Sequence, residues 1–304
     1  MDRGDTLVEI GAPGVGAVEA LLACDQAVFT SIRTPTGEGY RVIAASVAVG
    51  GDERAEITRR APAHGSLCDV ETAAVGLDSY RLERGRRCVA YTTYAGTEHT
   101  ARGGGRVYTH FALLQEADFR KLDADPLRAH WVLGEIFHTH GPILKPPPQL
   151  DPLHIPIADS VPLLPEPIEH SPLAAPVSDW LWPAVAELLK GGRVVLVGSN
   201  LSLELARLIL LCLPLAMRET LDVTFGLKPS ATRAAHLFIA QTLDLRSRQF
   251  LQGQGLSIWD TAHAPPLDDE PLPPWLDLLR TWWDAGSWAE ITDFFANARD
   301  QASP

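Results

Sequence analysis

Proline is concentrated in one stretch of the chain, and this stretch most constrains the fold. Eleven of the 24 prolines lie between Pro142 and Pro176, including a triplet at residues 146–148. Proline has a fixed φ and no backbone N–H, so regular helix and central strand are excluded there. The stretch is either a linker or an extended strap lying against both halves of the chain. We expect domains at residues 1–141 and 178–304, joined by residues 142–177.

The first half alternates β-prone runs with turns that contain glycine. Strands are predicted over residues 27–33, 40–45, 79–82, 87–94 and 106–114. The first two runs and the next two are joined by short segments that predict hairpins or short loops. Helices are predicted over residues 52–60 and 116–122. This pattern favours an α+β domain with mostly antiparallel strands.

The second half follows a different pattern, which predicts a small α/β domain and a helical, aromatic-rich C-terminus. A helix over residues 179–190 precedes a β-branched apolar strand at 194–197. The other predicted elements are a helix at 203–213, buried strands at 223–227 and 236–240, and helix within 274–297, which carries four of the eight tryptophans.

Charge and cysteine content exclude several classes of protein. The net charge of −12 opposes nucleic-acid binding, because that binding depends on Lys and Arg contacts to phosphates. Four arginines cluster on the second hairpin at residues 81–87, so local binding of an anionic partner is an alternative. The favoured interpretation of this cluster is a solvated hairpin edge. The four cysteines form no CxxC pair, so no zinc knuckle or dithiol motif is predicted. We expect a cytoplasmic protein, because no apolar run is long enough for a membrane span and the first residues lack a signal-peptide pattern. We also expect no cofactor.

Two segments resemble enzyme motifs but lack essential residues. Residues 11–16 form a glycine-containing loop, yet Ala17 and Val18 stand where a phosphate-binding loop needs Lys and then Ser or Thr. Residues 197–201 place Ser199 after a buried strand but lack the second glycine of a nucleophile elbow. Both segments therefore predict turns, and no complete catalytic set is found.

Three histidines are candidates for chemistry. His110 lies in a predicted strand and is either a general base or a hydrogen-bonded core histidine. His138 and His140 are weak metal-ligand candidates because they are two residues apart, as on a strand, whereas a helical zinc site uses histidines four apart. We expect no metal site and interpret this pair as surface or interdomain histidines at a helix end.

The turn between the first two strands carries the strongest candidates for partner binding. Arg33 and Arg41 flank it, and an arginine on a loop can stabilise a transferring phosphate in trans. The alternative is a pair of exposed hairpin charges. The predicted partner-binding residues are Arg33, Thr36, Glu38, Arg41 and Arg102.

Several segments resemble a known family in the same order along the chain. The sequence FTSIRTPTGEGYRVIAAS at residues 29–46 resembles the opening of the N-terminal domain of bacterial GTPase-associated proteins, although VAVG at 47–50 departs from that family's Pro-Gly-Leu. Further similar segments are YTTYAG at 91–96, GRVYTHFALL at 105–114 and ADF at 117–119. The segments VVLVG at 194–198, LELARLILLCLPL at 203–215 and LDVTF at 221–225 are similar to the family's middle domain, so the resemblance covers residues 27–245.

The resemblance implies a non-enzymatic adaptor or regulator that docks on a GTPase or another NTPase-linked partner in a bacterial conflict or signalling system. One alternative is a GTPase-activating protein in which Arg33 or Arg41 acts on the bound nucleotide. A second alternative is a hydrolase or nucleotide-binding enzyme centred on His110.

Overall fold

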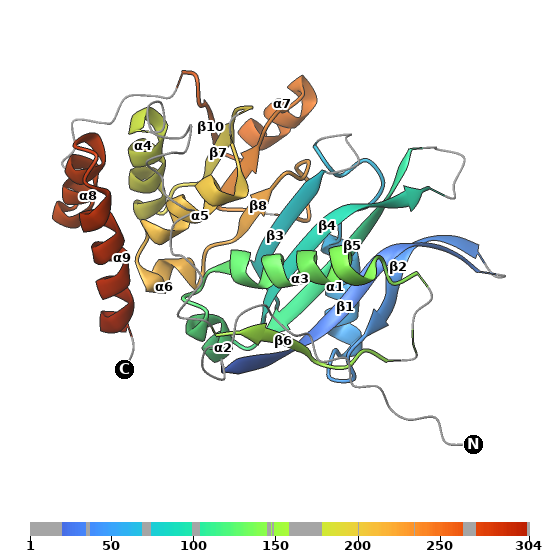
Figure 1. Cartoon of the computed structure of the whole chain (residues 1–304). Coiled ribbons are helices and arrows are strands. Elements are labelled where there is room, and N and C mark those ends of the chain that lie inside the picture. The colour runs from blue at the N-terminus through green and yellow to red at the C-terminus, as the bar shows by residue number, and fades with distance from the viewer. Residues whose placement is uncertain are drawn as a thin grey trace.

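Strands from both halves of the chain form one sheet (Figure 1). The computed structural model describes residues 20–34, 37–68, 74–98, 104–144, 147, 149–157, 178–199, 201–233, 235–263 and 272–302. Ten strands are paired in these ranges, in the order β10-β7-β9-β8-β3-β4-β5-β1-β2, with β6 also pairing with β1. The strands are β1 (Leu21–Thr34), β2 (Gly37–Ala45), β3 (Val75–Arg81), β4 (Arg87–Thr97), β5 (Gly105–Leu114), β6 (Leu153–Pro156), β7 (Val194–Val197), β8 (Val223–Phe225), β9 (Leu237–Ala240) and β10 (Ser257–Asp260).

The N-terminal half of this sheet is antiparallel, as its sequence predicts. β1 pairs with β2, and β3 pairs with β4, each across a short connection. β5 lies between β4 and β1 and is antiparallel to both. Glycine at the predicted turns allows backbone angles that other residues avoid, and Gly85 between β3 and β4 has φ of 89°.

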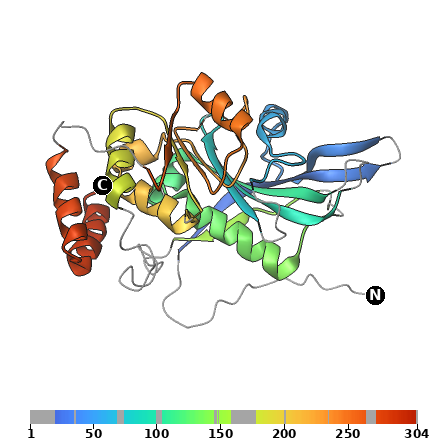
Figure 2. The ribbon, with the colours of Figure 1, turned by 90° about the horizontal axis from the view of Figure 1, so that it is seen from above.

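Helices cover both faces of the antiparallel part (Figures 1 and 2). The helix α1 (Gly51–Arg60) packs on one face, where Ile57 joins a cluster with Phe29, Tyr80 and Phe111. On the other face lie α2 (Glu116–Lys121) and α3 (Pro126–His140). The sequence pattern predicted α1 and α2 but not α3.

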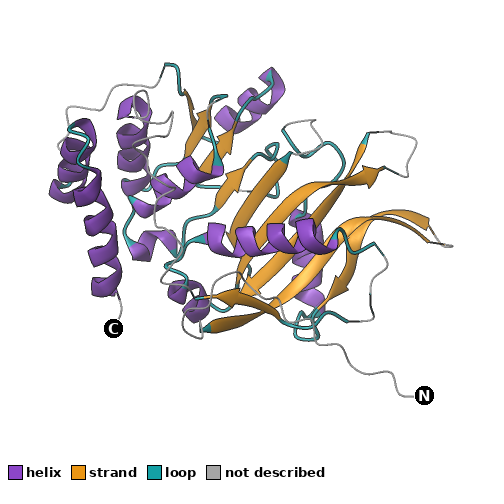
Figure 3. Cartoon of the chain, in the orientation of Figure 1, coloured by secondary structure: helices purple, strands orange, loops and turns teal. Residues whose placement is uncertain are grey.

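The strands of the C-terminal half are parallel and carry helices on both faces, as Figure 3 shows. Alternate residues of β7 face opposite ways, with Val194 and Leu196 in one apolar cluster and Val195 and Val197 in another. The first cluster includes residues of α4 (Ser178–Leu189), α5 (Leu203–Leu211), α8 (Pro274–Asp284) and α9 (Trp288–Ala302), and the second includes Leu251 of α7 (Leu245–Gly253). A short helix, α6 (Leu215–Arg218), follows α5.

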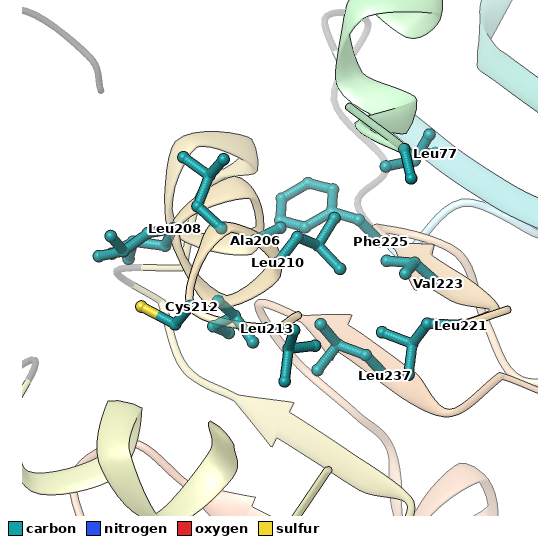
Figure 4. Packing of buried hydrophobic residues seen from close by; sticks show 14 of the residues in the cluster. Leu77, Ala206, Leu208, Leu210, Cys212, Leu213, Leu221, Val223, Phe225 and Leu237 are labelled. Carbon is teal, nitrogen blue, oxygen red and sulfur yellow. The ribbon is translucent and has the colours of Figure 1, made fainter. Parts of the chain in front are cut away.

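The core continues from one half of the chain into the other. β3 pairs with β8, so that Leu77 lies opposite Phe225 and Asp78 lies opposite Thr224. Figure 4 shows Leu77 together with Val223 and Phe225 in the same apolar cluster. The division into domains at residues 142 and 178 stays a prediction, and the described strands of both halves share one sheet.

Part of the proline-rich stretch lies against the N-terminal half. β6 pairs with the first residues of β1 at the side of the sheet, and Leu150 N–H donates to the carbonyl of Ala45 at 3.2 Å. Leu150, Leu153 and Ile155 are buried. Residues 149–157 therefore form a strap on this half, whereas residues 158–177 lie outside the described ranges.

Candidate functional site

A two-stranded arm extends from the sheet at the β1–β2 hairpin. Pairing between β1 and β5 ends at Thr30, whereas pairing between β1 and β2 continues to Thr34 and Gly37. Residues 31–34 and 37–40 are therefore paired with each other but with no third strand, and we call them the arm. Arg41 lies opposite Thr30, at the base of the arm. Figure 2 shows the hairpin reaching beyond the neighbouring strands.

The base of the arm is held by one buried carboxylate. Glu98, which is 6% exposed, accepts hydrogen bonds from Ser31 Oγ at 2.9 Å and from Tyr40 Oη at 2.5 Å. The Tyr40 oxygen also accepts from Val107 N–H at 3.1 Å, and the Tyr40 ring stacks on Phe29. Burial raises the pKa of Tyr40 most strongly, and the hydrogen bond to Glu98 raises it further. The Tyr40 hydroxyl therefore stays protonated and can donate. The arm therefore leaves the sheet from a fixed position.

The tip of the arm is charged and open to solvent. The Arg33 side chain is 78% exposed, and its Nε lies 4.0 Å from Glu38 Oε2. Arg41 is exposed, and its side chain makes no hydrogen bond or ion pair within the described residues. An exposed pair of this length contributes at most about 1 kcal/mol, so Arg33 can exchange its contact for another at little cost. The Arg41 side chain, at the base of the arm, has no such contact to break within the described residues. Thr36 and Arg102, the other predicted partner-binding residues, lie outside the described residues.

His110 is a core residue of β5 with a single hydrogen-bond partner. Its side chain is 1% exposed, and Nε2 donates to Gln26 Oε1 at 2.6 Å. The Gln26 amide then donates to the carbonyl of Asp151 at 2.7 Å, which ties the strap to β1. Burial lowers the pKa of His110 to about 4, so the ring is neutral at physiological pH.

His138 and His140 lie at the C-terminal end of α3, where both are exposed. The two-residue spacing therefore falls on a helix and not on a strand, and residues two apart do not share a helix face. Within the described part of the chain, no group of three or more His, Cys, Asp and Glu side chains is placed to hold a metal ion.

The seam between the two halves contains buried charges that sequence reasoning missed. Arg87, 3% exposed, lies 3.2 Å from Asp222 and also donates to the Leu221 carbonyl. Next to it, Asp78 accepts a hydrogen bond from Thr224 Oγ1 at 2.8 Å, and burial raises the pKa of Asp78 to about 6. The hint in the sequence is Asp78, the one acidic residue of β3. Its partners lie far along the chain, so their identity could not be inferred.

The described helices include none with the length and apolar character that a membrane span requires.

Comparison with protein families places a known domain over the N-terminal half. The family model described as GTPase-associated protein 1, N-terminal domain type 2, matches residues 23–153. This stretch contains the arm, its anchor Glu98, and most of the strap. The predicted resemblance to GTPase-associated proteins is thus confirmed for these residues, and it supports an association with a GTPase system. No curated protein matches the chain.

Proposed function

We propose that this protein is a non-enzymatic adaptor or regulator that docks on a GTPase, or on another NTPase-linked protein, through the arm. The observation that carries the proposal is the arm itself, which lies inside the matched GTPase-associated domain and presents charged side chains from a fixed base. A cytoplasmic bacterial conflict or signalling system, as the resemblance implies, is the proposed setting, and no cofactor is required.

The geometry of the arm favours docking over a structural role. A two-stranded ribbon without a third strand buries few apolar side chains, so its extension beyond the sheet adds little to the stability of the fold. The Glu98 cluster at its base fixes the exit of both strands. Binding through a preorganised element loses less conformational entropy than binding through a loop that must first become ordered.

The charges on the arm suit a protein surface better than nucleic acid. Arg33 and Glu38 carry opposite signs, and Arg41 adds one exposed guanidinium that can bind a carboxylate through two hydrogen bonds. The chain as a whole has a net charge of −12, which opposes a phosphate backbone. We therefore propose a protein partner that contacts the arm, and the C-terminal half is left for further contacts.

A GTPase-activating role is the second candidate, because Arg41 is exposed and makes no ion pair within the described residues. An arginine supplied in trans stabilises the charge that develops on the transferring phosphate and typically raises turnover by roughly 10³–10⁵. Docking alone requires no such effect, so the two candidates differ in the turnover of the partner.

Burial of His110 supports a non-enzymatic role over an enzyme centred on that residue. A general base must lie within hydrogen-bond reach of its substrate. His110 is 1% exposed and its Nε2 is already engaged by Gln26, so a substrate could reach it only after the core opened.

Calorimetric titration of the protein with candidate GTPase partners from its own operon tests the docking proposal. The double variant Arg33→Ala/Glu38→Ala should weaken binding by about tenfold, the effect of losing about 1.4 kcal/mol. The matched control is Asp277→Ala/Arg280→Ala, which also removes an exposed ion pair, here on α8, without changing net charge. Equal affinity of both double variants, or no binding to any such GTPase, contradicts the proposal.

Turnover of the same partner separates the two candidates. If the protein is an adaptor, Arg33→Ala and Arg41→Ala leave GTP hydrolysis per bound complex unchanged. If it is a GTPase-activating protein, one of these variants lowers hydrolysis by at least a hundredfold at saturating concentration, where docking is complete.

A further inference from the structure

A pocket of about 490 Å³ opens beside the seam, between α1, the β3–β4 turn and the loop that joins β8 to β9. Its polar lining consists of Glu56, Arg59, Arg60, Arg81, Glu83 and Thr232. Thr232 comes from the C-terminal half, so both halves build the pocket. The volume lies in the range of about 300–1,000 Å³ that is usual for small-molecule sites.

Arg60 is the central residue of this pocket because its side chain makes no hydrogen bond within the described part of the chain. The side chain is 16% exposed, and its Cζ lies 3.7 Å from the centre of the Tyr80 ring. Nε is buried without a hydrogen-bond partner, while Nη1 and Nη2 lie 3.9 Å from Glu56 and 3.7 Å from Asp222. These distances exceed hydrogen-bond length. Nη1 and Nη2 thus have ion-pair partners but no hydrogen bond among the described residues, and a ligand in the pocket can supply the acceptor oxygens.

Two further arginines bring positive charge to the same pocket with weak competing contacts. Arg59 lies 3.2 Å from Glu83, and Arg81 lies 3.3 Å from Glu116. All four side chains are about half exposed or more, and exposed pairs of this kind are weak. An anion that entered the pocket could therefore replace the carboxylates at little cost.

The far wall of the pocket is held in place by hydrogen bonds. Arg233 donates to the carbonyl of Arg60 at 3.3 Å and to the carbonyl of Lys228 at 2.6 Å. Lys228 N–H in turn donates to the Ser66 carbonyl at 2.6 Å. Thr232 is thus fixed near the end of α1, and a ligand that touches both walls would join the two halves.

We propose that this pocket binds a phosphate-bearing small molecule. The Arg60 guanidinium, stacked on Tyr80, presents a planar edge that matches two oxygens of a phosphate group. Arg59 and Arg81 neutralise the remaining charge, and Thr232 supplies a hydroxyl. The lining carries three arginines and two glutamates, and this excess of positive charge favours an anion. This site is separate from the arm and does not depend on the docking function.

Calorimetry of the full-length chain at low ionic strength tests the site, with pyrophosphate as the probe and inorganic phosphate and acetate as weaker anions. Pyrophosphate should bind at least tenfold more tightly than acetate. Arg60→Lys keeps the positive charge but loses the planar fork, and it should weaken pyrophosphate binding about tenfold or more. Glu83→Gln removes a competing carboxylate and should strengthen binding about threefold, a gain that a purely structural role of Arg60 would not produce.

Two further variants keep the test decisive. Arg59→Ala/Arg81→Ala changes only half-exposed side chains and should weaken pyrophosphate binding about tenfold. This double variant tests the pocket if Arg60→Lys fails to fold. Arg246→Ala on α7 removes an exposed arginine elsewhere and should leave binding unchanged. The proposal is overturned if pyrophosphate shows no saturable binding, or if Arg246→Ala weakens binding as much as the pocket variants do.

Discussion

Replacing Asp78 by asparagine should stabilise the protein at neutral pH. Asp78 is 3% exposed in β3, where it accepts the hydroxyl of Thr224 from β8. Burial outweighs the attraction of Arg233 and raises the pKa of Asp78 from 3.8 to about 6. The folded protein therefore holds this proton more tightly than the unfolded chain does. Asparagine keeps the acceptor oxygen for Thr224 and carries no charge to bury.

The magnitude follows from the two pKa values of Asp78. Each pH unit between them corresponds to about 1.36 kcal/mol, so the free energy of unfolding of the wild type falls by about 3 kcal/mol as pH rises from about 4 to about 6. Below about pH 4 the carboxyl group is protonated in both states and makes no difference. The variant lacks this titration, so its advantage should approach about 3 kcal/mol above pH 7 and vanish near pH 4.

Urea denaturation at pH 4 and pH 8 measures the effect. The matched control is Asp222→Asn, the same chemical change on a carboxylate that lies 3.2 Å from the buried Arg87. That variant should lose about 1.5–3 kcal/mol at pH 8, because a hydrogen bond to a charged group is weakened. The reasoning is refuted if Asp78→Asn is less stable than the wild type at pH 8, or if its advantage is the same at both pH values.

Two further predictions concern the arm and the seam. Tyr40→Phe removes the hydroxyl that binds Glu98 and should lower the free energy of unfolding by about 1–2 kcal/mol. Hydrogen exchange in residues 31–41 should become faster. Unchanged exchange would show that the hydrogen bonds of Glu98 do not hold the arm. Gly226→Ala should lower the free energy of unfolding by more than about 1 kcal/mol. Gly226 has a φ of +68°, and an added Cβ would lie 2.5 Å from the Val75 carbonyl oxygen. A melting temperature equal to that of the wild type would contradict this prediction.

Local sequence signals predicted most elements of the N-terminal half. Short turns with glycine set the β1–β2 and β3–β4 hairpins, and each pairing joins neighbours in sequence. The β3–β8 pairing was not predicted, because it joins strands that are far apart in the chain and no local pattern encodes it. For the same reason the seam and the pocket around Arg60 and Thr232 emerged only from the structure.

The helix α3 was missed although a local signal was present. Asp125 caps the helix by accepting from Leu127 N–H at 3.0 Å, and Pro126 stands in its first turn, where proline is favoured. His138 and His140 were interpreted as surface or interdomain histidines at a helix end, and both lie exposed in the last turn of α3. For the arm, the sequence predicted the two strands and the turn between them, whereas the pairing of Arg33 with Glu38 and the anchoring by Glu98 came from the structure.

Hydrogen exchange of the full-length chain, with and without its GTPase partner, tests docking through the arm most directly. The amides of residues 31–34 and 37–40 should become strongly protected in the complex, while those of α7 stay unchanged. A stable complex in which the arm exchanges as fast as in the isolated protein would contradict the account.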